Sequence, residues 1–291
     1  QYPLWSDGAT KRRWIRLPAG AAIDASRVDA WDFPRGTRLW KEFALGARVE
    51  TRLIERLADG TWRFTTYVWN ADGRDAVLAS ADGESVVVAG APGGRYAVPS
   101  ENDCRACHEA AAVPVLGFGA LQLSPDRDPN APHAERADGI EDLWSLVARG
   151  LLENLPARHL ATPPRIDASS PIERAALGYL HANCGHCHND PQQSGAGVPV
   201  DLLLAQSVGD PRSAARVRAS VLGAGKQTRF RHADAPTPSV AEVLVMRMRS
   251  RDPRTQMPPL GTALSDEQGT RLIERWIAGA AAAAVPAAAT R

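Results

Sequence analysis

The sequence predicts a mixed α+β fold, in which an N-terminal antiparallel β-sandwich-like domain precedes two mostly α-helical modules. Three observations lead to this prediction. Residues 1–99 carry β-branched and aromatic runs separated by Gly-containing turns. After Pro99, capping boxes precede apolar residues at helical spacing. Two Cys-x-x-Cys-His motifs lie within this second, helical part.

The N-terminal β-domain, residues 1–99, is predicted from its hairpin and turn signals. Val49–Leu57 and Thr61–Trp69 are separated by Ala58-Asp59-Gly60, which predicts a β-hairpin. Ser85–Ala89 is a shorter strand between further Gly-containing turns. Most of the eight tryptophans lie in this domain, where such side chains usually fill a core; a carbohydrate or aromatic ligand site is the alternative. They are Trp5, Trp14, Trp31, Trp40, Trp62 and Trp69.

Capping boxes mark three predicted helix starts, at Ser170, Ser239 and Ser265, where Glu or Gln follows three residues later. The last start leads into an apolar stripe that Gly279 is expected to end. The segment Tyr96–Asp103, ahead of the first Cys-x-x-Cys-His motif, is predicted to be a loop leaving the β-domain. The helical part is therefore expected to contain long loops.

Four segments are predicted along the chain. Residues 1–99 form the β-domain, residues 100–170 a shortened helical module, and residues 171–280 a second helical module. A helix over 171–182 is expected to close the first module and open the second, which would hold the two motifs close together. Residues 281–291 are Ala-rich and are predicted to form a disordered tail.

Composition excludes several classes of protein. The 291 residues are enough for two or three domains, and 44% hydrophobic with 23% charged residues is typical of a globular chain. A formal net charge of +1, without a long run of like charges, gives no indication of nucleic-acid binding. No stretch approaches the ~20 apolar residues of a membrane-spanning helix, so no transmembrane segment is predicted.

The two Cys-x-x-Cys-His motifs use all four cysteines of the chain. This pentapeptide is the attachment signature of c-type haem. Two thiols add across the porphyrin vinyl groups, and the adjacent His is an axial ligand of iron. The sequence therefore predicts two covalently bound haem c groups. Because this attachment occurs outside the bacterial cytoplasmic membrane, a periplasmic or secreted location is expected. The thioether residues are Cys104, Cys107, Cys184 and Cys187, and the iron ligands are His108 and His188.

Other uses of the cysteines fit less well. A four-cysteine zinc site usually separates its pairs by roughly 15–20 residues, far fewer than separate Cys107 from Cys184, and zinc does not explain a His after each pair. A thioredoxin-like motif needs a βαβ setting, which neither pair has. Disulfides within each pair would close very short loops and stabilise little.

The second module resembles a class I c-type cytochrome over residues 181–279. A helix, Ile172–His181, runs into the second motif, and Met257-Pro258-Pro259-Leu260-Gly261 precedes a capped terminal helix. In that family the Met of a Met-Pro-Pro segment is the sixth iron ligand, so the resemblance implies this role for Met257. The whole chain is similar to a group of secreted bacterial proteins that join a Trp-rich β-region, here Tyr2-Pro3-Leu4-Trp5-Ser6-Asp7-Gly8-Ala9, to two such modules.

The first module departs from this pattern, because no Met lies between His108 and Cys184. Aligned by architecture, His159-Leu160-Ala161-Thr162-Pro163-Pro164 takes the place of the Met-Pro-Pro segment. His159 is therefore the predicted sixth ligand of the first haem, with His133 or a five-coordinate iron as alternatives. A bis-His haem is expected to have a lower reduction potential than a His/Met haem.

The leading functional prediction is a dihaem electron carrier that works with redox partner proteins. Electrons would enter at the His108 haem and leave from the His188 haem. The enzymatic alternative is a dihaem peroxidase or oxidase, which needs an open iron position and an acid–base group such as Glu101, Glu109 or Glu135. In a third reading, the β-domain binds a glycan or a partner protein and the haems act as a relay.

Overall fold

The computed structural model describes residues 1–135, 139–190, 202–223 and 237–284, and it confirms the mixed α+β class. The strands are β1 (Thr10–Arg16), β2 (Ile23–Asp24), β3 (Arg38–Leu45), β4 (Ala47–Arg56), β5 (Trp62–Trp69), β6 (Ala76–Leu78), β7 (Glu84–Val87), β8 (Arg95–Val98) and β9 (Leu152–Glu153). Five of them form the main antiparallel sheet, in the order β1-β3-β4-β5-β6.

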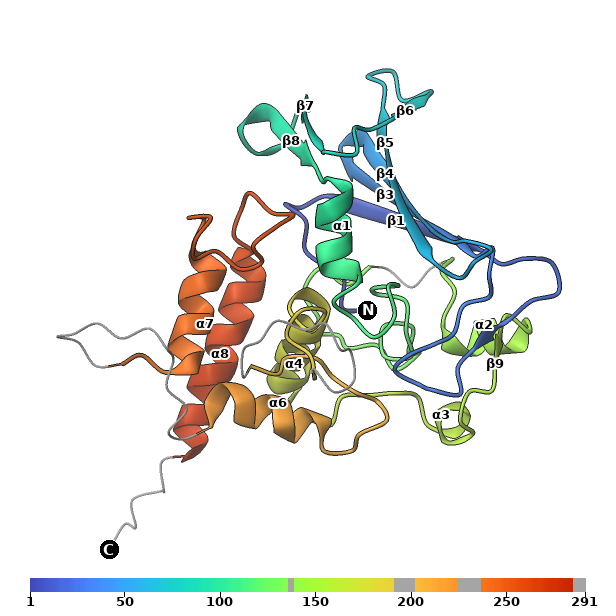
Figure 1. Cartoon of the computed structure of the whole chain (residues 1–291). Coiled ribbons are helices and arrows are strands. Elements are labelled where there is room, and N and C mark those ends of the chain that lie inside the picture. Colours follow the sequence, from blue (N-terminus) through green and yellow to red (C-terminus); the bar gives the residue numbers. More distant parts are fainter. Residues whose placement is uncertain (136–138, 191–201, 224–236, 285–291) are drawn as a thin grey trace, which may run out of the picture.

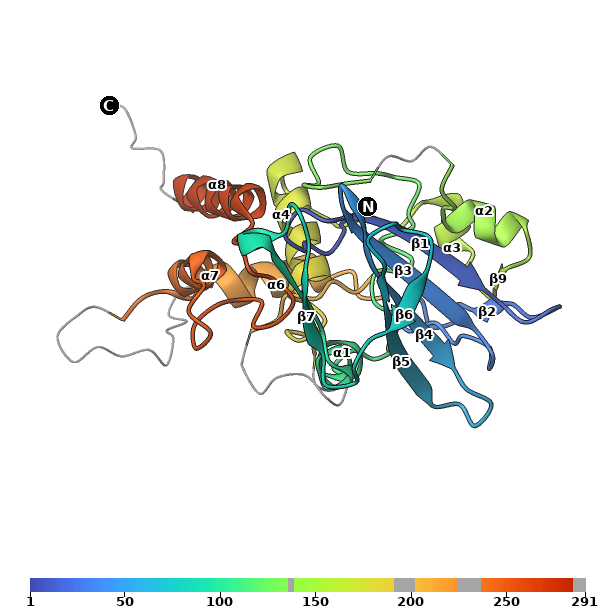
Figure 2. The ribbon, with the colours of Figure 1, turned by 90° about the horizontal axis from the view of Figure 1, so that it is seen from above.

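The helices lie mostly in the second half of the chain. They are α1 (Glu101–His108), α2 (Leu143–Ala148), α3 (Arg158–Ala161), α4 (Pro171–Asn183), α6 (Ser213–Leu222), α7 (Val240–Arg249) and α8 (Glu267–Ala284), and a 3-10 turn, η1 (Pro92–Gly94), precedes β8. Figures 1 and 2 show the main sheet on one side of the molecule, α7 and α8 on the other, and α1 between them. α4 packs against α8 around the fully buried Leu177, Leu180 and Ile273.

The predicted β-hairpin is confirmed as β4 and β5. Asp59 and Gly60 make its turn: the Asp59 carboxylate accepts from the Thr61 N–H at 2.8 Å, and Gly60 has φ +94°. Glycine takes this positive φ without steric strain. The turn sets the register in which Leu53 faces Thr65, and thereby decides which residues of both strands share a face.

The second layer of the predicted sandwich is much smaller than the first. The main sheet is joined by two two-stranded sheets, the antiparallel pair β7–β8 and the parallel pair β2–β9. Val98 of β8 packs with Val49 of β4, so the β7–β8 hairpin contacts the main sheet. Helices and loops take most of the place that a second large sheet would occupy.

Several predictions about where strands and helices begin or end are wrong. The segment Tyr96–Asp103, predicted as a loop, instead continues strand β8 to Val98 and becomes helical at Glu101, because Ser100 caps the helix. The last helix is not ended by Gly279 but continues to Ala284, into the predicted disordered tail. Alanine has the highest helix propensity and outweighs one glycine near the helix end. Residues 285–291 lie outside the described residues.

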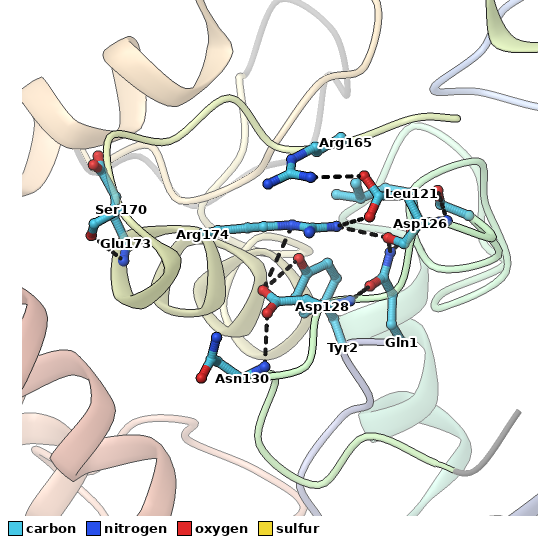
Figure 3. A network of polar contacts seen from close by, with 11 residues as sticks. Gln1, Tyr2, Leu121, Asp126, Asp128, Asn130, Arg165, Ser170, Glu173 and Arg174 are labelled. Carbon is cyan, nitrogen blue, oxygen red and sulfur yellow. Dashed lines mark hydrogen bonds and ion pairs between the residues drawn. The ribbon is translucent and has the colours of Figure 1, made fainter. Parts of the chain in front are cut away.

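The N-terminal segment is anchored on α4 by a buried polar network (Figure 3). Arg174 of α4 lies 3.2 Å from Asp126 and 3.8 Å from Asp128, and its side chain is 6% exposed. The Tyr2 hydroxyl donates to the Asp128 carboxylate at 3.0 Å. The Tyr2 ring lies on Gly178, where a Cβ would stand 2.1 Å from its Cε1 atom. The N-terminal residues therefore stabilise the helix that precedes the second motif.

Packing crosses the boundary predicted at residue 99. Ile23 and Phe33 from the N-terminal part share a core with Leu143 and Leu152 from the helical part. The β2–β9 pair joins the same two parts through backbone hydrogen bonds. Among the described residues, no helix is long and apolar enough to cross a membrane.

Candidate functional site

The first Cys-x-x-Cys-His motif occupies the second half of α1. Ser100 and Asp103 form a capping box, with the Asp103 N–H donating to the Ser100 hydroxyl at 3.0 Å and the Ser100 N–H to the Asp103 carboxylate at 2.9 Å. Cys104 and Cys107 are three residues apart on this helix, so their thiols lie on one face. Burial raises the pKa of Cys104. The helix thus presents both thiols together, as a two-point covalent attachment requires.

His108 ends α1 with one ring nitrogen occupied. Its Nδ1 donates to the Pro114 carbonyl oxygen at 2.8 Å, and its ring lies 5.3 Å from the Phe64 ring, centroid to centroid. A proton held on Nδ1 leaves the lone pair of Nε2 available to a metal ion. Burial lowers the pKa of His108 to about 4. The ring is therefore neutral, which is the form that ligates iron.

The second motif follows the C-terminus of α4 in a tight turn. The Cys187 and His188 N–H groups both donate to the Cys184 carbonyl, at 3.1 and 2.9 Å. Glycine is required at position 185, directly after Cys184, since a Cβ there would lie 2.6 Å from the His181 carbonyl oxygen. The turn therefore gathers the two thiols and the imidazole of this motif at one helix end.

His188 is half-buried, and its Nδ1 atom is buried and unpaired among the described residues. Its Nδ1 makes no hydrogen bond of regular geometry among the described residues, although the Leu202 backbone lies close enough to affect the pKa. Burial is the largest influence, and it lowers the pKa of His188. Buried polar atoms are nearly always paired, so an orphan one marks a site that lacks a partner.

The structure brings the two motifs into contact. The Cys107 and Cys187 thiols form a hydrogen bond, which raises the pKa of Cys107 to about 12 and lowers that of Cys187. The Asn189 side chain, just after the second motif, donates to the Ala110 carbonyl at 2.8 Å. No group of three or more His, Cys, Asp or Glu side chains in the described part of the chain has the arrangement of a metal site.

Met257 shares a narrow pocket with Cys184. The Met257 N–H donates to the Arg247 carbonyl at 3.0 Å, which ties the Met-Pro-Pro segment to α7. Arg251 donates to the Met248 carbonyl at 2.7 Å, and its Nε is buried without a hydrogen-bond partner among the described residues. Cys184 and the segment predicted to supply the sixth ligand thus meet at one place. The lining residues are Trp5, Tyr179, Asn183, Cys184, Met248, Arg251, Met257, Pro258, Leu264, Asp266 and Thr270.

His159 lies away from the first motif. It is buried on α3, where its Nε2 accepts from the Arg158 guanidinium at 3.1 Å. Both views place α3 on the far side of the molecule from α1 (Figures 1 and 2). The basic groups whose charge acts on His108 are instead Lys41, Arg52 and His186. The structure does not bring His159 to His108, and its role as sixth ligand stays a prediction.

The other sequence candidates have partners of their own. His133 hydrogen-bonds to the Asp266 carboxylate at 2.9 Å and lies against the Trp5 ring. Glu101 and Glu109 both pair with Arg105 on the exposed side of α1, at 2.8 and 2.6 Å. Glu135 pairs with Arg13 at 2.6 Å.

A hollow of about 410 Å³ lies on the face of the main sheet that points away from α1, called here the outer face. It holds three of the tryptophans that the sequence offered for a ligand site. Two of their rings already carry guanidinium groups, since Arg12 lies 5.0 Å from the Trp14 centroid and Arg48 lies 4.7 Å from that of Trp69. Cation–π contacts within the protein therefore already occupy a face of the Trp14 ring and a face of the Trp69 ring. The lining residues are Trp14, Trp40, Glu42, Arg48, Thr51 and Trp69.

Sequence reasoning missed a group of cations on the opposite, inner face, the face towards α1. Lys11 and Arg13 of β1, Lys41 of β3 and Arg52 of β4 lie on this side. The signal that would have found them is the alternation of charged residues along three neighbouring strands. Charged side chains at every second position usually mark a solvated face, and here that face is covered.

No protein-family model matches this sequence, and neither a curated protein nor a solved structure matches it. Function must therefore be inferred from the residues themselves and from their geometry.

Proposed function

We propose that this protein is a dihaem c-type cytochrome that carries electrons outside the cytoplasmic membrane. The observation that carries the proposal is the contact between the Cys107 and Cys187 thiols. Two attachment motifs in contact would hold two porphyrins side by side, which suits electron passage between them. A protein that needed two independent haems would have no reason to join their attachment points.

The residues present fit this cofactor. Cys104 and Cys107 share a helix face, and the Nδ1 bond of His108 to the Pro114 carbonyl orients its ring with Nε2 available. At the second motif, His188, whose Nδ1 is unpaired among the described residues, is the ligand, and the Met257 thioether is the partner that the cytochrome resemblance implies. Bound haem supplies reversible one-electron exchange at iron. The protein's part is to fix the ligands, exclude water and set the two potentials.

Direction of transfer follows from ligand chemistry. A Met ligand raises the reduction potential of haem iron, so the His188–Met257 site is the electron exit. The His108 site has no Met within its own module and is the lower-potential entrance. Redox partner proteins would donate to the first site and accept from the second.

The test is to produce the chain with a haem-attachment system and to titrate it by absorbance against potential. Two one-electron steps of equal amplitude are expected, with the lower step lost in Cys104→Ala/Cys107→Ala and the higher in Cys184→Ala/Cys187→Ala. A haem-free product from a competent host would reject the proposal, and equal potentials, or a higher potential at the His108 haem, would overturn the assigned direction of transfer. Met246→Ala, on the exposed side of α7, is the matched control and should change neither potential.

A second candidate, a dihaem peroxidase-like enzyme, is favoured by the position of His159. With α3 lying apart from α1, the first iron would keep an exchangeable position unless another residue fills it. Ferric EPR of the full-length protein distinguishes the two functions. A high-spin first haem with peroxide turnover indicates the enzyme, and two low-spin haems that are inert to peroxide indicate the carrier.

A further inference from the structure

The inner-face cations are neighbours in the sheet. Arg13 of β1 pairs in register with Lys41 of β3, and Lys41 pairs with Arg52 of β4. Lys11 lies two residues before Arg13 and faces Phe43 of β3. Because side chains alternate between the two faces of a sheet, all four basic groups point to the same side.

These cations converge on a buried spot. Phe43 is fully buried, and its ring centroid lies 5.9 Å from Lys11 Nζ, 5.1 Å from Lys41 Nζ and 4.4 Å from the Arg52 guanidinium carbon. Burial lowers the pKa of Lys11 to about 8 and that of Lys41 well below its usual range. Both lysines are half-buried, and two amino groups gathered around one buried aromatic ring favour the approach of an anion.

Two of the four positive charges are already neutralised. Arg52 pairs with Glu50 at 2.5 Å, and Arg13 pairs with Glu135 at 2.6 Å. Lys11 donates only to the Ala9 carbonyl, at 3.0 Å, and Lys41 has neither an ion pair nor a hydrogen bond among the described residues. Both amino groups therefore lack an anionic partner there.

The nearby acids do not supply those partners. Asp7 acts on Lys11 at longer range, but its carboxylate accepts the Ala263 and Leu264 N–H groups at 2.8 and 2.9 Å. Glu42 lies on the outer face and pairs with Arg48 at 3.2 Å. Two unneutralised cations remain on the inner face, and one haem carries two carboxylates.

This group of cations borders the first attachment motif. The charges of Lys41 and Arg52 both act on His108, and Arg52 with its partner Glu50 also acts on Cys104. Phe64, on the same sheet face, contacts the His108 ring. A porphyrin attached at Cys104 and Cys107 would therefore lie against this part of the sheet.

We propose that Lys41 and Lys11 bind the two carboxylates of the haem attached at Cys104 and Cys107, which makes the β-sheet half of that haem's binding site. This assignment rests on the proposed function, because it requires haem at the first motif. Charge-assisted hydrogen bonds from these two half-buried lysines would fix the rotation of the porphyrin relative to α1. These hydrogen bonds would also give the lysines on the inner face of the main sheet a role in the shortened module that carries the first motif.

The expected effect is a change in the potential of one haem. A positive charge near iron favours the reduced state, so Lys41→Met should lower the potential of the His108 haem and leave that of the His188 haem unchanged. A unit charge about 10 Å away at an effective dielectric constant of ~20 alters the ratio of reduced to oxidised haem roughly tenfold. That ratio corresponds to ~59 mV for a one-electron couple.

The experiment compares full-length, haem-loaded variants by redox titration and ferric EPR. Lys41→Arg keeps the charge and should stay close to wild type. Arg12→Met removes an exposed cation from the outer face and is the matched control. Equal potentials in Lys41→Met and Arg12→Met would overturn the proposal. So would a change from low to high spin in Lys41→Met, since it would make Lys41 an iron ligand instead.

If Lys41→Met does not fold, Lys11→Met is the second variant to measure. A fall in the reduction potential of the His108 haem is again expected. No shift in Lys11→Met would overturn the proposal for that residue. Failure of the proposed function looks different, because the wild-type protein would then contain no haem at the first motif.

Discussion

Replacing Arg174 by Met tests how firmly the second motif is supported. Arg174 lies near the start of α4, whose other end leads into Cys184. Its side chain is 6% exposed and neutralises Asp128, whose side chain is 1% exposed. In Arg174→Met that carboxylate would keep only the Tyr2 hydroxyl at 3.0 Å and the Asn130 N–H at 2.9 Å. A buried charge would remain without its counter-charge (Figure 3).

Removing one partner of a buried ion pair costs about 3–5 kcal/mol. In a chain of this size each kcal/mol lowers Tm by about 2–4 °C, so a fall of roughly 6–20 °C is expected. The assay is thermal unfolding of the purified haem-loaded protein, followed by far-UV circular dichroism.

Arg165→Met is the matched control, because Arg165 pairs with the same Asp126 at 3.2 Å but its side chain is 59% exposed. Such surface pairs contribute about 0–1 kcal/mol. Equal losses of stability in Arg174→Met and Arg165→Met would refute the reasoning that burial makes the Arg174 pair important.

Three further predictions concern the haem ligands and pH. Met257→Ala should turn the His188 haem high-spin and lower its potential, with Met246→Ala unchanged; an unaltered spectrum would show that another group is the sixth ligand. His159→Ala should remove the low-spin signal of the His108 haem if the sequence prediction is right, and a signal that persists would reject it. Burial lowers the pKa of His181 from its ordinary 6.5 to about 4, so the unfolded chain binds more protons in that interval and stability should fall as pH drops through it. His181→Gln should flatten this slope in pH-dependent unfolding, whereas an unchanged slope would assign it to other groups.

Local signals were sufficient where one short segment determines the structure. Asp59 and Gly60 predict the β4–β5 hairpin because the turn needs a side-chain acceptor and a positive φ. Ser170 and Ser239 cap α4 and α7 as expected; the full capping box forms at Ser239, whereas at α4 Glu173 accepts the N–H of Ser169 instead. Ser265 is not the cap of α8, since the carboxylate of the next residue, Asp266, accepts the Gly269 N–H at 2.9 Å.

The parts that sequence did not predict depend on distant contacts. The start of α1 is not predicted from sequence, because its capping box has Asp103 three residues after the N-cap Ser100, where Glu or Gln is usual. The inner face was not recognised because Lys41 and Arg52 come from different strands and only the register brings them together. The contact between Cys107 and Cys187 likewise joins α1 to the end of α4, and the spacing of residues within either motif does not predict it.

The most direct test of the dihaem proposal is the intact mass of the protein, purified under denaturing conditions after production with a haem-attachment system. The wild-type chain should carry the added mass of two haem groups. Cys104→Ala/Cys107→Ala and Cys184→Ala/Cys187→Ala should each carry one. An unmodified chain, or one that differs only by the loss of two hydrogens in a Cys107–Cys187 disulfide, would contradict the proposal.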